Sequence, residues 1–343
     1  MCLNSDLPSR RIFRCWRAAL LTALGLGLGL SAAHAAGFRK ITTQGVRAGV
    51  WYPGDASITP QRLGPFETKM ARNAPIREGQ HPVVLFSHGN GGRYRNHYLT
   101  AQVLADTGFV VIAPQHEADY LVGGRRTAQA LDHRYVELAR ALKAVREDPA
   151  FRDHLAPEPV HGVGYSLGGM TIMLASGAGF ASERAERHCR ENQRADIAFC
   201  DDDPGFFHRL IQSFRHDPDL RPTPDPFRHP PLVTGRAVVV APVFQGVDPE
   251  KPLSMAHLTV IAIDGDRIAK PEFHAHPLFD AAKQQVPARS HTVPGHHHAF
   301  IAPFPKWLTD QEDIPVAKDP EGFDRPVFLR TVNRIILNAL AGD

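Results

Sequence analysis

A serine inside a glycine-rich pentapeptide is the feature of this sequence best suited to chemistry. Gly164-Tyr165-Ser166-Leu167-Gly168 follows an apolar run and precedes small residues with a helical pattern. Between a strand and a helix, the G-x-S-x-G pattern predicts a nucleophile elbow, a strained turn that raises the serine hydroxyl above the sheet. We therefore expect Ser166 to be a nucleophile. The backbone N–H of Leu167, at the helix N-terminus, is expected to bind an oxyanion.

A second glycine-rich segment, Ser87-His88-Gly89-Asn90-Gly91-Gly92, follows an earlier apolar run. Its glycines let the chain turn back over the sheet edge, so a backbone N–H near Asn90 can supply the second oxyanion donor. A phosphate-binding loop is the alternative, but no Gly-Lys-Ser/Thr sequence follows. We expect His88 to hold this loop in place and not to act as a base.

Candidates for the base and the acid come late in the chain, in the order that this topology requires. His296, His297 and His298 follow the last predicted strand. We expect His297 to be the base and keep His298 as the reserve. A metal site is the other interpretation of three histidines, but adjacent side chains point in different directions, so we expect none. Asp264 and Asp266 end the preceding strand; we favour Asp266 as the acid that orients the imidazole, with Asp264 in reserve.

Strands and helices that alternate along the chain must position these residues. The patterns predict buried strands at 83–86, 109–113, 160–165, 237–240, 258–263 and 289–293, and an edge strand at 45–52. Helices are predicted at 96–107, 131–146, 170–178, 277–285 and 326–340, and a loop-rich segment at 53–79. This alternation indicates an α/β fold with a doubly wound, mostly parallel sheet.

Residues 179–235 interrupt the alternation, because this stretch is rich in Arg, Asp, His and Pro. It is predicted to be a cap-like insertion over the sheet. Its phenylalanines form either a lid over the site or the insertion's own small core (Phe206, Phe207, Phe214).

The first 35 residues have the pattern of an export signal. Four arginines precede an apolar core at 18–30, and Ala33-His34-Ala35 is typical of a cleavage site. Two of the arginines resemble a twin-arginine signal, with an ordinary Sec signal as the alternative. The apolar core is shorter than the roughly 20 residues of a membrane span. We expect a mature chain of residues 36–343 that is periplasmic or secreted and has no stable membrane anchor.

The net charge limits the classes of partner to expect, and the cysteines indicate the redox compartment. The sequence has 39 Lys and Arg against 36 Asp and Glu, but the first 35 residues hold four of the arginines and one aspartate, which leaves 35 of each. A balanced chain is not expected to bind nucleic acid. Cys189 and Cys200 are the cysteines that remain after that segment, and in an oxidising compartment they predict a disulfide, with two free thiols as the alternative. We find no further zinc ligands at suitable spacing around them.

Taken together, the motifs resemble the α/β-hydrolase superfamily over nearly all of the mature chain. Within it, the chain is similar to the bacterial predicted dienelactone hydrolases that resemble platelet-activating-factor acetylhydrolases. The resemblance lies in residues 87–92, 162–169 and 297–303, and the last is similar to the family's His-x-x-Phe-Leu-x-Pro pattern. It implies an α/β-hydrolase fold and favours His297. Two departures matter: true dienelactone hydrolases have a cysteine where this chain has Ser166, and the acid region lacks the commoner Gly-x-x-Asp-Pro pattern.

These features predict an exported serine hydrolase of carboxylic esters with short- to medium-chain acyl or acetyl groups. A small-molecule ester is the expected partner, and no cofactor is implied. An amidase or peptidase with the same triad is one alternative. A non-catalytic binding protein on the same fold is the other.

Overall fold

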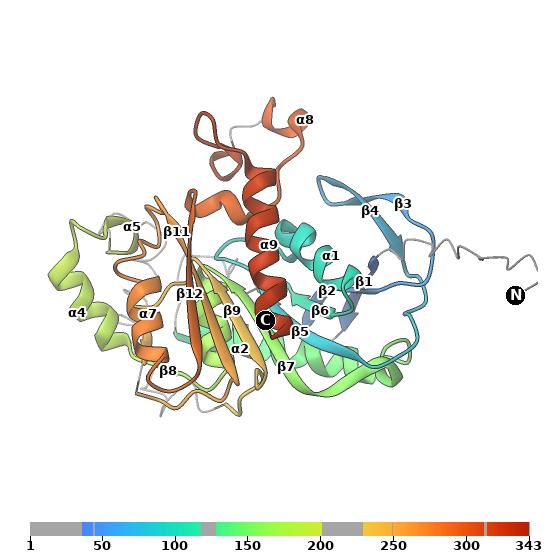
Figure 1. Ribbon diagram of the computed structural model, residues 1–343, viewed down its shortest axis with the longest axis horizontal. Coiled ribbons are helices and arrows are strands. Elements are labelled where there is room, and N and C mark those ends of the chain that lie inside the picture. Colours follow the sequence, from blue (N-terminus) through green and yellow to red (C-terminus); the bar gives the residue numbers. More distant parts are fainter. Residues whose placement is uncertain are drawn as a thin grey trace, which may run out of the picture. The chain divides into compact units, whose positions relative to one another are not determined.

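A ten-stranded mixed sheet forms the centre of this computed structural model, which describes residues 36–43, 45–117, 128–200, 229–248, 250–311 and 314–342. The predicted export segment and Phe206, Phe207 and Phe214 of the insertion lie outside these residues. The strand order is β12-β11-β9-β7-β5-β6-β2-β1-β4-β3 (Figure 1). Six neighbouring strands are parallel: β5 (His81–Ser87), β6 (Val110–Pro114), β7 (Leu155–Tyr165), β9 (Arg236–Val240), β11 (His257–Asp264) and β12 (Ala288–Pro294).

Helices cover both faces of these strands, which explains their continuous apolar sequences. In β5, Val83 and Leu85 belong to one core cluster and Val84 and Phe86 to the other, since alternate residues of a strand face opposite sides. The first cluster includes residues of α2 (Ala128–Glu147), α3 (Leu167–Ala175) and α7 (Ala275–Ala282). The second includes residues of α1 (Tyr98–Asp106) and α9 (Arg325–Ala341).

Shorter elements connect or extend this framework. Ser182–Asn192 (α4) and Ile197–Cys200 (α5) lie in the predicted insertion, where β8 (Gly179–Phe180) pairs with β10 (Val247–Asp248). The others are η1 (Tyr94–His97), η3 (Arg152–His154), η4 (His297–Phe300), η5 (Pro315–Ala317) and α8 (Lys306–Thr309). Within the described residues, no helix has both the length and the apolar character needed to cross a membrane.

The predicted α/β architecture is confirmed, and each predicted helix and buried strand is present with slightly different ends. The edge strand predicted at 45–52 is wrong in its position, because β2 (Val46–Pro53) lies between β6 and β1. Alternation along the segment suggests a solvent-facing side. A side-chain carbon at Gly49, however, would lie 2.7 Å from the Tyr94 ring, which covers that side of the strand.

The N-terminal part of the sheet also differs from the prediction. Residues 53–79, expected to be loop-rich, contain an antiparallel pair of strands, β3 (Thr59–Leu63) and β4 (Phe66–Arg72). Pro60 is compatible with β3 because this strand lies at the edge of the sheet. A further strand, β1 (Ala36–Thr43), was not predicted. It begins at the buried Ala36, whose N–H donates to Asp106 Oδ1 at 2.7 Å.

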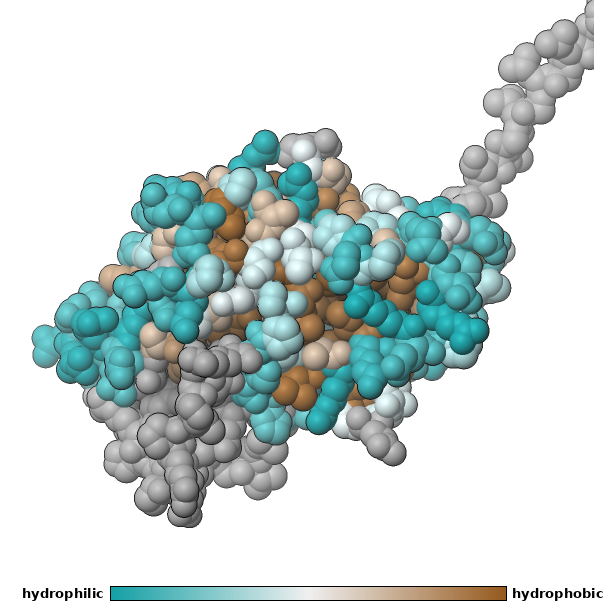
Figure 2. All heavy atoms as spheres, turned by 90° about the horizontal axis from the view of Figure 1, so that it is seen from below, coloured by the Kyte–Doolittle hydropathy of each residue, from teal (hydrophilic) through white to brown (hydrophobic). Residues whose placement is uncertain are grey.

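The surface is polar around an apolar centre on the face drawn in Figure 2. There, apolar residues are visible in the middle of the described part and hydrophilic residues border them.

Candidate active site

Ser166 lies at the turn between β7 and α3 and has the strained backbone of an elbow. Its φ is +54° and its ψ is −121°, a region that residues other than glycine rarely occupy. A side chain at Gly164 would collide with the backbone of Gly168, and one at Gly168 would collide with the carbonyl of Ser87. Both glycines are therefore required by close backbone approach, which is the physical reason for the pentapeptide.

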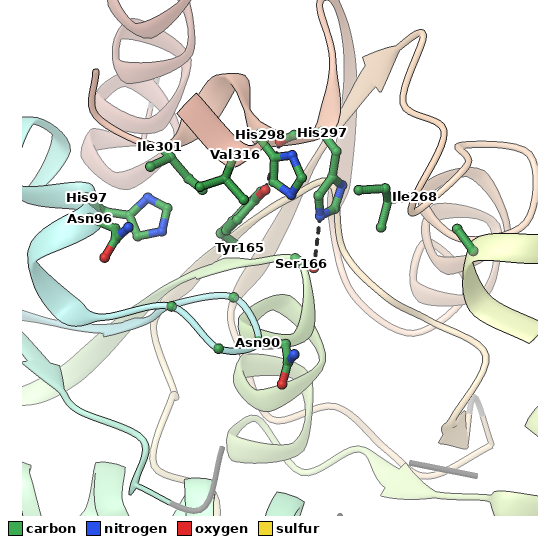
Figure 3. A pocket seen from close by; sticks show the side chains of 14 residues that line it. Asn90, Asn96, His97, Tyr165, Ser166, Ile268, His297, His298, Ile301 and Val316 are labelled. Carbon is green, nitrogen blue, oxygen red and sulfur yellow. Dashed lines mark hydrogen bonds between the residues drawn. The ribbon is translucent and has the colours of Figure 1, made fainter. Parts of the chain in front are cut away.

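The fold brings Ser166, His297 and Asp266 together. His297 Nε2 lies 3.2 Å from Ser166 Oγ (Figure 3). On the other side of the ring, His297 Nδ1 lies 2.7 Å from Asp266 Oδ2. With Nδ1–H donating to the carboxylate, Nε2 accepts the serine hydroxyl proton. The three residues are only 4–6% exposed. They come from three places: the elbow, the loop after β11 and the turn η4.

Asp266 is held as a charged acceptor. Its Oδ1 accepts the backbone N–H groups of Ile268 at 2.8 Å and Ala269 at 2.9 Å. Burial alone would raise the pKa of this carboxyl, but the hydrogen bond and charge of His297 and the two N–H groups outweigh it. The pKa of Asp266 therefore lies below its usual value. Such a carboxylate fixes the imidazole tautomer and stabilises the imidazolium.

In the part of the chain that the structure describes, the two reserve residues and His296 make no hydrogen bond to Ser166 or Asp266. Asp264 is exposed, and its backbone carbonyl accepts the N–H of Gly295 at 3.0 Å. His296 Nε2 lies 2.8 Å from Asp319 Oδ1, away from the serine. His298 lines the pocket, and burial, followed by the neighbouring histidines, lowers its pKa to about 4. It is therefore neutral at neutral pH.

The residues expected to supply the oxyanion donors lie near the serine in sequence or in the pocket. Leu167 opens α3 directly after Ser166. Residues 89–92 line the pocket in front of it, and a side-chain carbon at Gly89 would lie 3.4 Å from Ser166 Cβ. The Gly89 carbonyl accepts from His88 Nδ1 at 2.7 Å and from Gly92 N at 3.1 Å. The peptide group between Gly89 and Asn90 is planar and trans. The N–H of Asn90 therefore points in the direction opposite to the Gly89 carbonyl, out of the turn.

A pocket of about 370 Å³ opens over the serine. Its side walls are largely apolar, with Ile268, Ile301 and Val316 around the histidines (Figure 3). The volume is near the lower end of the roughly 300–1,000 Å³ typical of small-molecule sites. Burial, and secondarily the charge of Asp266, raises the pKa of Tyr165 well above its usual value. The Tyr165 hydroxyl therefore stays protonated and donates to the His297 carbonyl at 2.8 Å.

The predicted insertion contributes Ala198 to the pocket wall from α5. The predicted disulfide between Cys189 and Cys200 is present and ties α4 to α5. Sequence analysis found no further ligands near these cysteines, but the fold places donor atoms of His188, Asp196 and Cys200 within 4.8 Å of one another. The Cys200 sulfur is bonded to Cys189, so it is not a thiolate there.

Asp196 instead lies in a buried polar cluster that was not predicted from the sequence. Its Oδ2 lies 2.8 Å from His188 Nε2 and 3.2 Å from His274 Nε2. Burial would raise the pKa of this carboxyl, but the two imidazoles lower it overall. The cluster joins α4 to the residue that precedes α7. In the sequence, the one signal for this cluster is that His188 and Asp196 lie close to the two cysteines. His274 is distant along the chain and gives no such signal.

Comparison with known proteins agrees with this picture for part of the chain. The family model described as platelet-activating factor acetylhydrolase, isoform II, matches residues 54–146. None of the curated proteins compared with the chain matches it. The matched segment includes the loop at 87–92 and lies before Ser166, Asp266 and His297. The predicted resemblance is thus confirmed over that segment. With the parallel sheet, it identifies an α/β-hydrolase fold and supports a hydrolase of the esterase kind.

Proposed function

We propose that this chain, matched at residues 54–146 by the platelet-activating factor acetylhydrolase family, is an exported serine hydrolase of carboxylic esters. Short- to medium-chain acyl esters, or acetyl esters, are the substrate class. The observation that supports the proposal most is the hydrogen-bonded series from Ser166 through His297 to Asp266 at the floor of a pocket.

The geometry supports an acyl-enzyme mechanism. Ser166 Oγ attacks the ester carbonyl carbon while His297 Nε2 takes its proton, and Asp266 stabilises the imidazolium. The N–H groups of Leu167 and Asn90 bind the oxyanion of the tetrahedral intermediate. His297 then gives the proton to the leaving alkoxide, and an alcohol departs. Water attacks the acyl-serine with His297 again as base, and the carboxylic acid is released.

The pocket supports a neutral, apolar acyl group. Ile268, Ile301 and Val316 offer aliphatic contacts, and the small volume suits a short chain. His298 faces the same space and, with a pKa of about 4, carries no charge at neutral pH. Apolar surface transferred from water into such walls contributes roughly 25 cal/mol per Å² to binding.

The proposal includes the chain's organisation and location. Residues 1–35 are a removable export signal, residues 36–343 the hydrolase domain and residues 179–235 its cap. The disulfide between Cys189 and Cys200 supports an oxidising compartment, either the periplasm or the medium outside the cell.

A fluorophosphonate probe tests the nucleophile. We expect it to label the wild-type protein and the Ser176→Ala variant, and to leave Ser166→Ala unlabelled. Ser176 is the control because it is a buried serine directly after the C-terminal end of α3, and its hydroxyl donates to the carbonyl of Ile172. Loss of labelling in the wild type, or its persistence in Ser166→Ala, refutes a serine hydrolase.

The substrate class is tested with p-nitrophenyl esters of increasing acyl length beside the matching anilides. We expect turnover of acetate to hexanoate esters, with a decline for longer chains. Anilide turnover equal to or above ester turnover would make the protein an amidase and contradict the proposal.

A further inference from the structure

A second Ser–His–acid series lies beneath the oxyanion loop. Ser87 Oγ lies 2.9 Å from His116 Nε2, and His116 Nδ1 lies 2.8 Å from Glu137 Oε2. Ser87 ends β5, His116 follows β6 and Glu137 is on α2. The order of groups repeats that of the series at Ser166, so its role must be decided from its surroundings.

Ser87 cannot act as a nucleophile. Its side chain has no exposed surface, and its oxygen already accepts a hydrogen bond from Arg134 Nη2 at 3.2 Å. Burial, followed by the charge of Arg134 and by His88, lowers the pKa of His116 well below its usual value. The imidazole is therefore neutral, with Nδ1–H donating to Glu137 and Nε2 accepting from Ser87. The hydrogen bonds run in one direction, from a guanidinium to a carboxylate.

Arg134 connects this series to both sides of the candidate active site. It is fully buried on α2, and its Nη2 also donates to the carbonyl of His88 in the oxyanion loop. Its Nε donates to Thr171 Oγ1 at 2.8 Å, and the Thr171 hydroxyl donates to the Leu167 carbonyl at 3.0 Å. One planar cation thus contacts the loop and, through Thr171, the first turn of α3.

These contacts fix the peptide groups that carry the expected donors. Arg134 holds the carbonyl of His88. The His88 ring accepts the N–H of His116 at Nε2, at 3.2 Å, and donates from Nδ1 to the Gly89 carbonyl. The hydrogen bond to the Gly89 carbonyl sets the plane of the Gly89–Asn90 peptide group, and therefore the direction of the Asn90 N–H. The other expected donor is the N–H of Leu167. The Leu167 carbonyl, in the adjoining peptide group of the same turn, is held by Thr171.

We propose that Arg134 is the positioning residue of the oxyanion site, because its guanidinium holds loop 87–92 and the first turn of α3 in one fixed arrangement. The inference rests on the proposed serine hydrolase function. Ser87, His116 and Thr171 act through Arg134 and touch no substrate.

This role predicts a specific kinetic signature. A displaced N–H donor weakens binding of the charged transition state and hardly changes binding of the neutral ester, so kcat falls while KM stays nearly constant. A residue with only a structural role would lower thermal stability without producing this split.

Thr171→Val is the decisive variant. It keeps the shape of the side chain, removes the hydroxyl between Arg134 and Leu167, and leaves Arg134 in place. Ser176→Ala is its matched control, because Ser176, at the C-terminal end of α3, is also fully buried and donates to the carbonyl four residues earlier, Ile172, at 2.8 Å. Thr171→Ser restores the hydroxyl and serves as the rescue.

The assay measures kcat and KM with p-nitrophenyl acetate and the inhibition constant of a trifluoromethyl ketone, whose adduct with serine carries an oxyanion. We expect Thr171→Val to lower kcat about tenfold, less than the roughly 100- to 1,000-fold for loss of a whole donor. KM should change less than about twofold, and the ketone should bind weaker by the same factor as kcat/KM. Thr171→Ser and Ser176→Ala should stay within about twofold of wild type.

The outcomes separate this proposal from the proposed function. If the wild type hydrolyses esters but Thr171→Val retains its kcat and its ketone affinity, the positioning role is refuted while the serine hydrolase stands. An equal loss in Ser176→Ala also refutes it, because the effect would then belong to the helix. A wild type with neither ester turnover nor fluorophosphonate labelling refutes both.

Discussion

Replacing Asp266 by asparagine changes which nitrogen of His297 carries the proton. The asparagine oxygen would take the N–H groups of Ile268 and Ala269, which Asp266 Oδ1 now accepts at 2.8 and 2.9 Å. Its NH₂ group would then face His297 Nδ1, where the carboxylate Oδ2 lies 2.7 Å away. An NH₂ group cannot accept a proton, so Nδ1 becomes the acceptor and the imidazole proton moves to Nε2. Nε2 then cannot take a proton from Ser166.

The size of the effect follows from the tautomer. In the serine protease triad, the same aspartate-to-asparagine change lowers kcat by about 10⁴. At about 1.4 kcal/mol per factor of ten, this is roughly 5 kcal/mol of transition-state stabilisation. The variant keeps both backbone hydrogen bonds and loses one charge-assisted bond, worth about 1.5–3 kcal/mol of stability. We therefore expect a folded protein with very low activity.

Steady-state hydrolysis of p-nitrophenyl acetate by Asp266→Asn and Asp264→Asn measures this directly. Asp264 is exposed and contacts the last strand through its backbone carbonyl. Its variant should stay within about twofold of wild type, as expected for an exposed position. A greater loss in Asp264→Asn, or more than a tenth of the wild-type kcat in Asp266→Asn, would show that the acid is assigned to the wrong residue.

Three further results are expected. His297→Ala should lose about 10³-fold or more in kcat while His298→Ala keeps most activity, and the reverse result in the same ester assay would shift the base by one residue. Cys189→Ser removes the disulfide to Cys200, which spans a sequence separation of 11 residues. It should lower the free energy of unfolding, measured in urea, by about 3 kcal/mol. No change would mean that the loop is already ordered without the bond. The depressed pKa of Asp266 contributes stability that is complete above its unfolded pKa of about 3.9 and is lost as the pH falls through the folded value. Urea titrations should therefore give a lower free energy of unfolding at pH 3 than at pH 6. The difference between the two pH values should be smaller in Asp266→Asn, which lacks this carboxyl.

The central fold and the three residues of the candidate triad can be predicted from the sequence, because both follow from short sequence patterns. Continuous apolar runs mark strands buried on both faces, and parallel strands carry their C-terminal loops to one edge of the sheet. Ser166, Asp266 and His297 each follow such a strand. Choosing His297 among three neighbours required a family pattern, because strand spacing does not say which adjacent side chain faces the serine.

The buried polar network escaped prediction for a physical reason. Arg134 lies in a helix with an amphipathic pattern, in which an arginine is expected on the solvent side, yet it is fully buried. Its acceptors come from the end of β5 and from α3, and only the folded chain brings them together. The strands β3 and β4 were missed because their polar alternation resembles a loop when Pro60 and Gly64 interrupt it.

The hydrogen bond at Ala36 would have a consequence for the proposed removal of the export segment. Cleavage after Ala35 would convert the amide of Ala36, now 2.7 Å from Asp106 Oδ1, into an α-ammonium group beside the same carboxylate. A hydrogen bond in which only the acceptor is charged would thereby become an ion pair with charges on both groups, which is shorter and stronger. The ammonium pKa would rise above its unfolded value of about 8, so the gain would be present below pH 8, where Asp106 is ionised, and lost as the pH rises through the folded value. Burial raises the pKa of Asp106, so the gain would also be lost once this carboxyl is protonated at low pH. Removal of the export segment would then tighten the first strand of the sheet, so that precursor and mature protein differ in stability through a single bond.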